Sequence, residues 1–453
     1  MKVQNRTGHS VYISDIDKNF SPTEVVDFYE LSKQDLLKSA SLRKLIRSGS
    51  FYPIEWDASS SLESSLQKES EQSSQMVMKE KNKDSSGILL RGQFLDYSGY
   101  GKVNRNLAIC LKKNGISLSV NAIDHSHPRL IGNDLIVGSS FPYTHSTVGD
   151  VVIDSIVPSF DTARGKKKSI LYTTVESYTI PSNFADIFKR YDEIWTTSNF
   201  CKSVISQHFS GPIFVVPGIV DSFTYNTSGH KADISAQAKS FKFISVFNWN
   251  YRKGPDALLK AYCKAFSHVD DVTLILVCRK KRISGPASGV KDEVEKIIHD
   301  LNLKNPPHIM RVTKELNEES IASIYRACNA FVLPSRGEGY GLPYLEASLC
   351  GLPVIGTNVS AMQDILNNKN SMLLDIDRLS KVPVNATGAY FWDEHIMADL
   401  TSESFINSLA DGMKDMYINY KKYVEKNKDL QKFTENHASA KSIFNIIKER
   451  ISC

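Results

Sequence analysis

Residues 330–358 decide the fold, and they read AFVLPSRGEGYGLPYLEASLCGLPVIGTN. A short apolar run ends at Pro334, a loop with three glycines follows, and Pro343 opens a helix that ends near Gly351. A second apolar run begins at Val354, so the order is strand, glycine loop, helix and strand. In such a unit the crossover is right-handed, and the loop lies at the carboxyl edge of a parallel sheet, where open α/β folds bind ligands.

The composition of this loop predicts a phosphate-bearing ligand. Glycines let backbone amides approach an anion, and the first turn of the following helix adds unpaired N–H groups and a positive dipole end. Glu338 and Glu346 bracket the loop, and a carboxylate accepts hydrogen bonds from neighbouring hydroxyls. The two acids therefore indicate a clamp for a sugar nucleotide. The alternative is that an acid early in the helix only stabilises its dipole.

The whole string resembles the signature of the family-four retaining glycosyltransferases, which have the GT-B fold. The matching residues are Glu338, Gly339, Gly341, Leu342, Pro343, Glu346, Ala347, Gly351, Pro353 and Val354. In that family the first glutamate lies against the donor sugar and the second holds the ribose, so the resemblance implies these roles for Glu338 and Glu346. The donor-binding loop implied here consists of Gly339, Tyr340, Gly341 and Leu342. The resemblance extends from about residue 88 to the end of the chain.

Length and composition limit the classes of protein to which this chain can belong. The 453 residues suit two or three domains, and the apolar and charged fractions are those of a soluble globular protein. No apolar run is long enough to span a bilayer, and the polar start shows no export signal, so we expect a cytoplasmic protein, in the host cytoplasm if the chain is viral. The seven scattered cysteines fit a reducing compartment. The net charge of +5 permits a membrane surface or nucleic acid as partner without selecting one.

We predict an α/β chain with two Rossmann-like domains, each a doubly wound parallel sheet, facing a cleft. Residues 1–58 form a small accessory module that faintly resembles one at the front of some bacteriophage-encoded proteins; the alternative is a disposable extension. Residues 59–87 are serine-rich and charged and predict a flexible linker. The acceptor-side domain follows at 88–222 and the nucleotide-sugar domain at 241–432. A terminal helix within 433–453 is expected to cross back to the first domain.

Two features of the first domain point to its cleft. A strand at 88–92 is followed by Gly99 and Gly101 before a helix over 102–114, and their position resembles the family's donor-phosphate loop. Tight turns need glycine for steric reasons alone, so that alternative stays open. Glu176 follows another strand, and the resemblance implies that it orients the acceptor hydroxyl or binds the donor sugar. The alternative is a solvated loop acid.

The second domain supplies the cations. Its first strand ends at Asn248, and Arg252 and Lys253 follow just before a helix. A guanidinium fork and an ammonium point charge can both reach a diphosphate, whereas two cations at a helix start oppose its dipole. This string resembles the family's arginine-lysine diphosphate site, with Asn248 among the donor contacts. Thr313 ends a strand resembling the one whose backbone reads the nucleobase.

Two further segments bear on the partner of the protein and on the family resemblance. Residues 279–282 are four consecutive cations where the family has a glycine-rich end, and they indicate either a grip on an anionic acceptor or nucleic acid, or, as we favour, a solvated loop. Residues 389–393 resemble the family's late aromatic-acid element.

The sequence therefore predicts a retaining glycosyltransferase that uses a nucleotide-diphosphate sugar as donor, without a further cofactor or a bound metal. The acceptor, whether a glycan, a lipid or a protein, is left open, as is peripheral membrane contact. One alternative is a phage-type enzyme that glycosylates modified DNA bases, which is not favoured. Another is a non-catalytic binding protein on a GT-B scaffold.

Overall fold

A computed structural model describes residues 2–5, 11–13, 18–20, 25–27, 51–55, 85–123, 130, 134, 137–138, 140–279, 289–383 and 395–451. Before residue 85 these are five strands, namely β1 (Lys2–Asn5), β2 (Val11–Ile13), β3 (Lys18–Phe20), β4 (Val25–Asp27) and β5 (Phe51–Glu55). Strands β4, β1 and β5 form an antiparallel sheet, and β2 pairs with β3. The remaining residues of the accessory module expected at 1–58 lie outside the described residues.

The first large sheet has six parallel strands in the order β11-β10-β9-β8-β6-β7. The strands are β6 (Ser85–Gly92), β7 (Leu118–Ala122), β8 (Val148–Ser155), β9 (Arg164–Thr173), β10 (Glu193–Thr196) and β11 (Ile213–Val215). Their helices are α4 (Gly99–Lys113), α6 (Phe184–Phe188) and α7 (Asn199–Ile205). Strand β6 begins at Ser85, inside the stretch that we assigned to the linker, and its apolar centre is fully buried, as in a parallel sheet covered on both faces.

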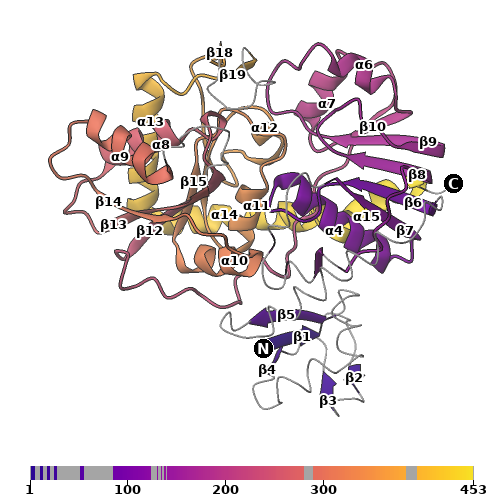
Figure 1. The fold of residues 1–453 in the computed structure, drawn as a ribbon. Coiled ribbons are helices and arrows are strands. Elements are labelled where there is room, and N and C mark those ends of the chain that lie inside the picture. Colours follow the sequence, from indigo (N-terminus) through magenta and orange to yellow (C-terminus); the bar gives the residue numbers. More distant parts are fainter. Residues whose placement is uncertain are drawn as a thin grey trace.

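The second large sheet is also six-stranded and parallel, in the Rossmann order β14-β13-β12-β15-β16-β17. Its strands are β12 (Phe241–Asn248), β13 (Val272–Arg279), β14 (His308–Val312), β15 (Ala330–Leu333), β16 (Val354–Thr357) and β17 (Met372–Leu374). Its helices are α8 (Pro255–Ala265), α9 (Val290–Asp300), α10 (Glu318–Ala327), α11 (Leu342–Leu349), α12 (Met362–Ile365) and α13 (Glu403–Ile418). A small hairpin of β18 (Leu379–Lys381) and β19 (Ile396–Ala398) is added. The two sheets lie side by side, which confirms the predicted fold class (Figure 1).

The chain returns to the first domain at its carboxyl end. Helix α14 (Tyr420–His437) packs on the second domain, where the Asn427 amide donates to the Ser348 carbonyl at 3.0 Å. Helix α15 (Ala440–Ile451) buries Ile443, Ile447 and Ile451 in the core of the first domain (Figure 1). This crossing joins the two cores. No helix among the described residues is long and apolar enough to cross a membrane.

The strand orders place a binding crevice in each domain. In the first sheet the order reverses between β6 and β8, and in the second between β12 and β15. Ligands of open α/β sheets bind at such a switch point, outside the carboxyl ends of the strands. The segments that leave β6, β12 and β15 line one shared cavity. The topology of the two sheets thus sets the position of the site.

Candidate active site

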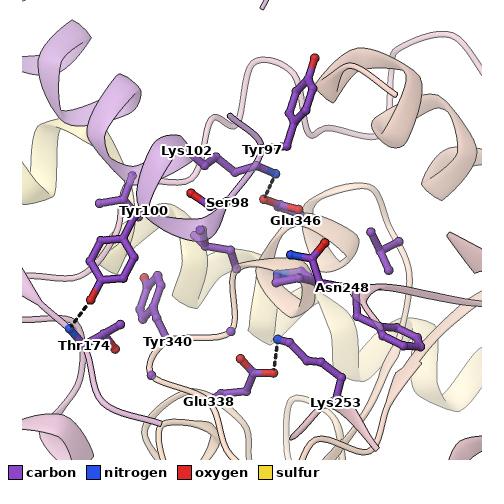
Figure 2. A pocket seen from close by; sticks show the side chains of 18 of the residues that line it. Tyr97, Ser98, Tyr100, Lys102, Thr174, Asn248, Lys253, Glu338, Tyr340 and Glu346 are labelled. Atoms are coloured by element: carbon purple, nitrogen blue, oxygen red, sulfur yellow. Dashed lines mark hydrogen bonds and ion pairs between the residues drawn. The ribbon is translucent and has the colours of Figure 1, made fainter. Parts of the chain in front are cut away.

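The cavity between the two domains has a volume of about 270 Å³. It is lined by these residues that we predicted from the sequence: Gly99, Glu176, Asn248, Arg252, Lys253, Glu338, Gly339, Tyr340, Gly341, Leu342 and Glu346. Residues from both domains point into it (Figure 2). Segments that are far apart in the chain therefore meet here, as the glycine loop and the cation pair suggested.

Glu338 is held by both predicted cations. Lys253 donates from its Nζ to Glu338 Oε1, and Arg252 Nη1 lies 3.1 Å from Glu338 Oε2 (Figure 2 shows the Lys253 contact). Burial alone would raise the pKa of Glu338, but Lys253 and Arg252 outweigh it and lower that pKa to about 2. Burial lowers the pKa of Lys253, and Glu338 opposes that shift. Glu338 is therefore an ionised carboxylate, able to accept hydrogen bonds but not to act as an acid.

Arg252 also joins the two domains. Its Nη2 lies 2.9 Å from Oε1 of Glu176, which belongs to the first domain, while Nη1 donates to the Gly337 carbonyl at 2.6 Å. The side chain of Glu176 is 21% exposed, so the structure places it at the cavity wall and not in a solvated loop. One guanidinium thus bridges an acid from each domain.

Two glycines of the loop allow the domains to approach. A Cβ atom at Gly337 would lie 1.9 Å from the Glu176 carbonyl oxygen, and one at Gly339 would lie 1.7 Å from Thr174 Oγ1. The Gly339 carbonyl also accepts a hydrogen bond of 2.7 Å from the Thr197 hydroxyl. Since no side chain fits at either position, these glycines are needed for contact with the first domain. This steric role adds to the one predicted from the sequence, in which the glycines let backbone amides approach an anion.

The amino terminus of α11 opens into the cavity. Its N-cap residue is Gly341, which has a φ of 84° and offers no side chain to cap the first amides. Gly341, Leu342 and Pro343 all line the cavity. Such a terminus presents N–H groups and a positive partial charge to an anion.

Glu346 lies one turn into α11 and is 2% exposed. Burial raises the pKa of this carboxyl, and the ammonium of Lys102 opposes the rise. Lys102 Nζ donates to Glu346 Oε1 at 2.7 Å from the opposite domain (Figure 2). The carboxylate that we expected at the ribose is thus buried and ion-paired.

Arg336 fixes the glycine loop to the cation-bearing segment. Its guanidinium is fully buried, donates to both Asp256 oxygens at 2.9 and 2.8 Å, and donates to the Tyr251 carbonyl at 2.6 Å. Its backbone amide donates to the Arg252 carbonyl at 2.7 Å. The position of Arg252 relative to Glu338 therefore depends on Arg336, which the sequence analysis did not single out.

One end of the cavity is apolar. Its lining consists of Val246, Phe247, Val277, Cys278, Val312, Leu316 and Ile321. This apolar surface suits a planar ring, whereas a polar sugar phosphate would gain nothing from it. Thr313, predicted here, is exposed and does not line the cavity, whereas its neighbours Val312 and Lys314 do. Successive side chains of an extended segment point to opposite sides, so Thr313 points away from the cavity when Val312 and Lys314 point into it.

Gly101, the second predicted phosphate glycine, does not line the cavity. Its amide donates to Ser98 Oγ at 3.0 Å, because Ser98 is the N-cap of α4. A Cβ atom at Gly101 would lie 2.6 Å from the Asp96 carbonyl oxygen. Gly101 therefore allows the capped first turn of α4 to pack against Asp96. Helix α4 begins at Gly99, three residues before the predicted start.

Several lining residues of the first domain were not predicted from the sequence. They include Tyr97, Ser98, Tyr100, Lys102, Ser155 and Thr174. The Tyr100 hydroxyl lies 3.0 Å from Thr173 Oγ1 and accepts from the Thr174 amide at 3.2 Å, so it closes the wall at the end of β9. A cation directly after the G-x-G turn was the available signal for Lys102.

Some predictions fall outside the described residues. These are the cations at 280–282, the Arg279 side chain, and residues 389–393. Among the residues that the structure does describe, no group of three or more His, Cys, Asp or Glu side chains is arranged to hold a metal ion.

Comparison with known proteins agrees with this geometry. Residues 238–381 match the family described as "Glycosyl transferases group 1". The structure superimposes on HepE from Anabaena, solved in complex with UDP and glucose, with a TM-score of 0.58 and 16% identity over 81% of this chain and 99% of that one. Sucrose-phosphate synthase from Thermosynechococcus elongatus gives a TM-score of 0.56 and 15% identity over 81% and 98% of the two chains. The chain has the GT-B fold.

Curated relatives match over shorter stretches. D-inositol 3-phosphate glycosyltransferase from Arthrobacter sp. (strain FB24) is 28% identical over 152 residues, which is 32% of this chain and 33% of the relative. The lipopolysaccharide core biosynthesis mannosyltransferase LpsB from Rhizobium meliloti (strain 1021) is 28% identical over 188 residues, 39% of this chain and 48% of the relative. These matches therefore span between a third and a half of the relatives' own length.

Proposed function

We propose that this GT-B protein is a retaining glycosyltransferase that moves a sugar from a nucleotide-diphosphate donor to an acceptor hydroxyl. The observation that carries the proposal is the meeting of Arg252, Lys253 and the uncapped start of α11 with Glu338 and Glu346 in one interdomain cavity. The names of the relatives support it, since they are glycosyltransferases and mannosyltransferases, and HepE was solved with UDP-glucose.

Each part of such a donor has a suitable partner among the residues that line the cavity. The nucleobase would enter the apolar end of the cavity, and the ribose hydroxyls would donate to Glu346. The diphosphate would lie between the cations Arg252 and Lys253 and the first amides of α11. The sugar would then contact Glu338, whose ionised carboxylate accepts from its hydroxyls.

The two cations and the helix amides favour the chemical step because they stabilise the negative charge of the leaving diphosphate. When the bond between the sugar and the diphosphate breaks, negative charge builds on the leaving group, and the two cations and the helix amides stabilise that charge as it forms. Retention fits a same-face reaction in which the leaving phosphate takes the proton of the acceptor, as the family resemblance implies. The carboxylates of Glu176 and Glu338 are engaged by Arg252, so neither is assigned the role of nucleophile.

We place the acceptor on the side of the first domain. Glu176 lines the cavity there, as do Ser155, Thr173 and Thr174, whose side chains carry hydroxyls. Glu176 would accept a hydrogen bond from the attacking hydroxyl and orient it, and the nearby hydroxyls would bind the rest of a hydroxyl-rich acceptor.

A panel of nucleoside diphosphates and their sugars tests the proposal. A donor that binds the folded state should raise the thermal midpoint, and slow hydrolysis of the same donor should release the nucleoside diphosphate. Nuclear magnetic resonance of the sugar after transfer to an acceptor should show the anomeric configuration of the donor. A protein that neither binds nor hydrolyses any donor is a binding protein on this scaffold. Inversion at the anomeric carbon would reject retention alone.

A further inference from the structure

Glu346, the carboxylate proposed to bind the ribose, is paired with a lysine from the opposite domain. Lys102 lies in the first turn of α4, directly after Gly101, and Glu346 lies on α11 of the second domain. Their side chains are 13% and 3% exposed, and their charged atoms are 2.7 Å apart. A buried cation is costly unless it is paired, so this contact has a specific geometry and is not an incidental surface ion pair.

Lys102 sits within a larger network across the cleft. Its Nζ lies 3.6 Å from Glu318 at the start of α10 and donates to the Tyr225 hydroxyl at 3.0 Å. Arg105, one turn further along α4, lies 3.1 Å from the other Glu318 oxygen. Two cations of one helix thus reach two carboxylates of the other domain.

The network keeps Glu346 in one place. Lys102 lies between Glu346 and Glu318, two acids that would otherwise repel each other at close range. Lys102 occupies Oε1 of Glu346. The second carboxylate oxygen is then left to receive a hydroxyl, because an ionised carboxylate accepts at both of its oxygens.

Resting on the function proposed above, we propose that Lys102 is the positioning residue that orients Glu346 toward the donor ribose, so that the ribose site is complete only when the two domains are closed. The first domain then contributes to donor selection without contacting the ribose. Arg105 supports this arrangement by holding Glu318 away from Glu346.

The pH dependence of ribose binding should reveal this role. The ionisable groups that interact with Glu346 are Lys102 on α4, Glu318 and Tyr325 on α10, Tyr225 between the domains, and Cys350 at the end of α11. Arg105 on α4 pairs with Glu318. Burial raises the pKa of Glu346 and Lys102 opposes that rise, so loss of the Lys102 charge should raise this pKa further. A protonated Glu346 accepts fewer hydrogen bonds from the ribose, and the loss should therefore be greatest at low pH.

The test compares the nucleoside diphosphate that the wild type binds best with its 2′,3′-dideoxy form. Affinities for both are measured by calorimetry at pH 6 to 9 on the full chain. The wild type should prefer the ribose form by roughly ten- to hundredfold, the range for hydrogen bonds to a charged group. In Lys102→Gln and Lys102→Met the preference should fall to about threefold or less and recover partly as pH rises, while Lys102→Arg should keep most of it. Lys113→Gln, an exposed position on the same helix, is the matched control.

The outcomes separate this inference from the proposed function. If Lys102 were only structural, both ligands would weaken equally and the preference would be unchanged in Lys102→Gln and Lys102→Met, which overturns the inference. If the wild type discriminates while these variants do not, it stands. A wild type that binds neither ligand overturns the proposed function as well. Circular dichroism identifies any variant that does not fold, and Met keeps the apolar stem of lysine should Gln fail.

Discussion

Replacing Arg252 by alanine removes a side chain that contacts an acid of each domain. Its guanidinium lies 2.9 Å from Glu176 and 3.1 Å from Glu338, and it donates to the Gly337 carbonyl at 2.6 Å. If this cation stabilises the leaving diphosphate, its removal should cost about 2 to 4 kcal/mol of transition-state free energy. That is a loss of roughly 30- to 900-fold in turnover.

Folding should suffer less than turnover. Glu338 keeps its ion pair with Lys253, whereas Glu176, whose side chain is 21% exposed, loses its partner. We expect the free energy of unfolding to fall by about 1 to 3 kcal/mol, the cost of one charge-assisted contact. Arg252→Lys should lie between the wild type and alanine, since a single ammonium lacks the guanidinium fork that reaches both acids.

The assay is donor hydrolysis followed by release of the nucleoside diphosphate, at saturating donor and below the thermal midpoint of each variant. Lys264→Ala is a suitable control, because this exposed cation on α8 pairs with Glu403 at 3.5 Å and does not line the cavity. A folded Arg252→Ala protein with turnover within threefold of the wild type would refute the assignment of Arg252 to the leaving group.

Three further changes test other parts of the site. Glu346→Ala should abolish the thermal shift produced by the best nucleoside diphosphate; an undiminished shift would reject the ribose assignment. Gly339→Ala should lower turnover on the order of a hundredfold, since its methyl would lie 1.7 Å from Thr174 Oγ1 and separate the domains; adding Thr174→Gly should restore part of it, and no rescue would argue against the steric cause. Burial raises the pKa of Asp134 to about 6, so this acid favours the folded state fully below pH 4 and loses that contribution as pH rises through about 6. Asp134→Asn should therefore raise the thermal midpoint at pH 8 by more than at pH 4, and equal effects at both would contradict the shift.

The elements that could be predicted are those with strong local patterns. The strand expected at 88–92 lies within β6, because its three consecutive apolar residues followed by a turn are typical of a buried parallel strand. The segment from β15 to β16 likewise follows the order that its glycines and prolines indicate. The start of α4 was predicted too late because Ser98 caps the helix before the glycines. Thr313, the residue after β14, was wrongly predicted to line the cavity, because a shift of one position reverses the direction of a side chain.

The residues that could not be predicted act on partners distant in the chain. Lys102 and Glu346 are 244 positions apart, and Arg336 and Asp256 are 80 apart. A single lysine or arginine in a sequence does not indicate which acid it will meet. Gly337 and Gly339 belong to the same group, since the backbone and side chain that exclude a methyl there come from the other domain.

Local patterns in the sequence account for the order of strands and helices along the chain, the glycine loop before α11, and the kinds of residue available for a diphosphate and two sugars. Those features depend on neighbours within a few turns of the chain, through hydrogen-bond geometry and hydrophobic periodicity. Only the tertiary structure decided that Arg252 faces Glu176 as well as Glu338, and that Lys102 holds Glu346. Electrostatic attraction and steric fit depend on distances across the domain boundary, and those distances are set by how the two sheets pack together.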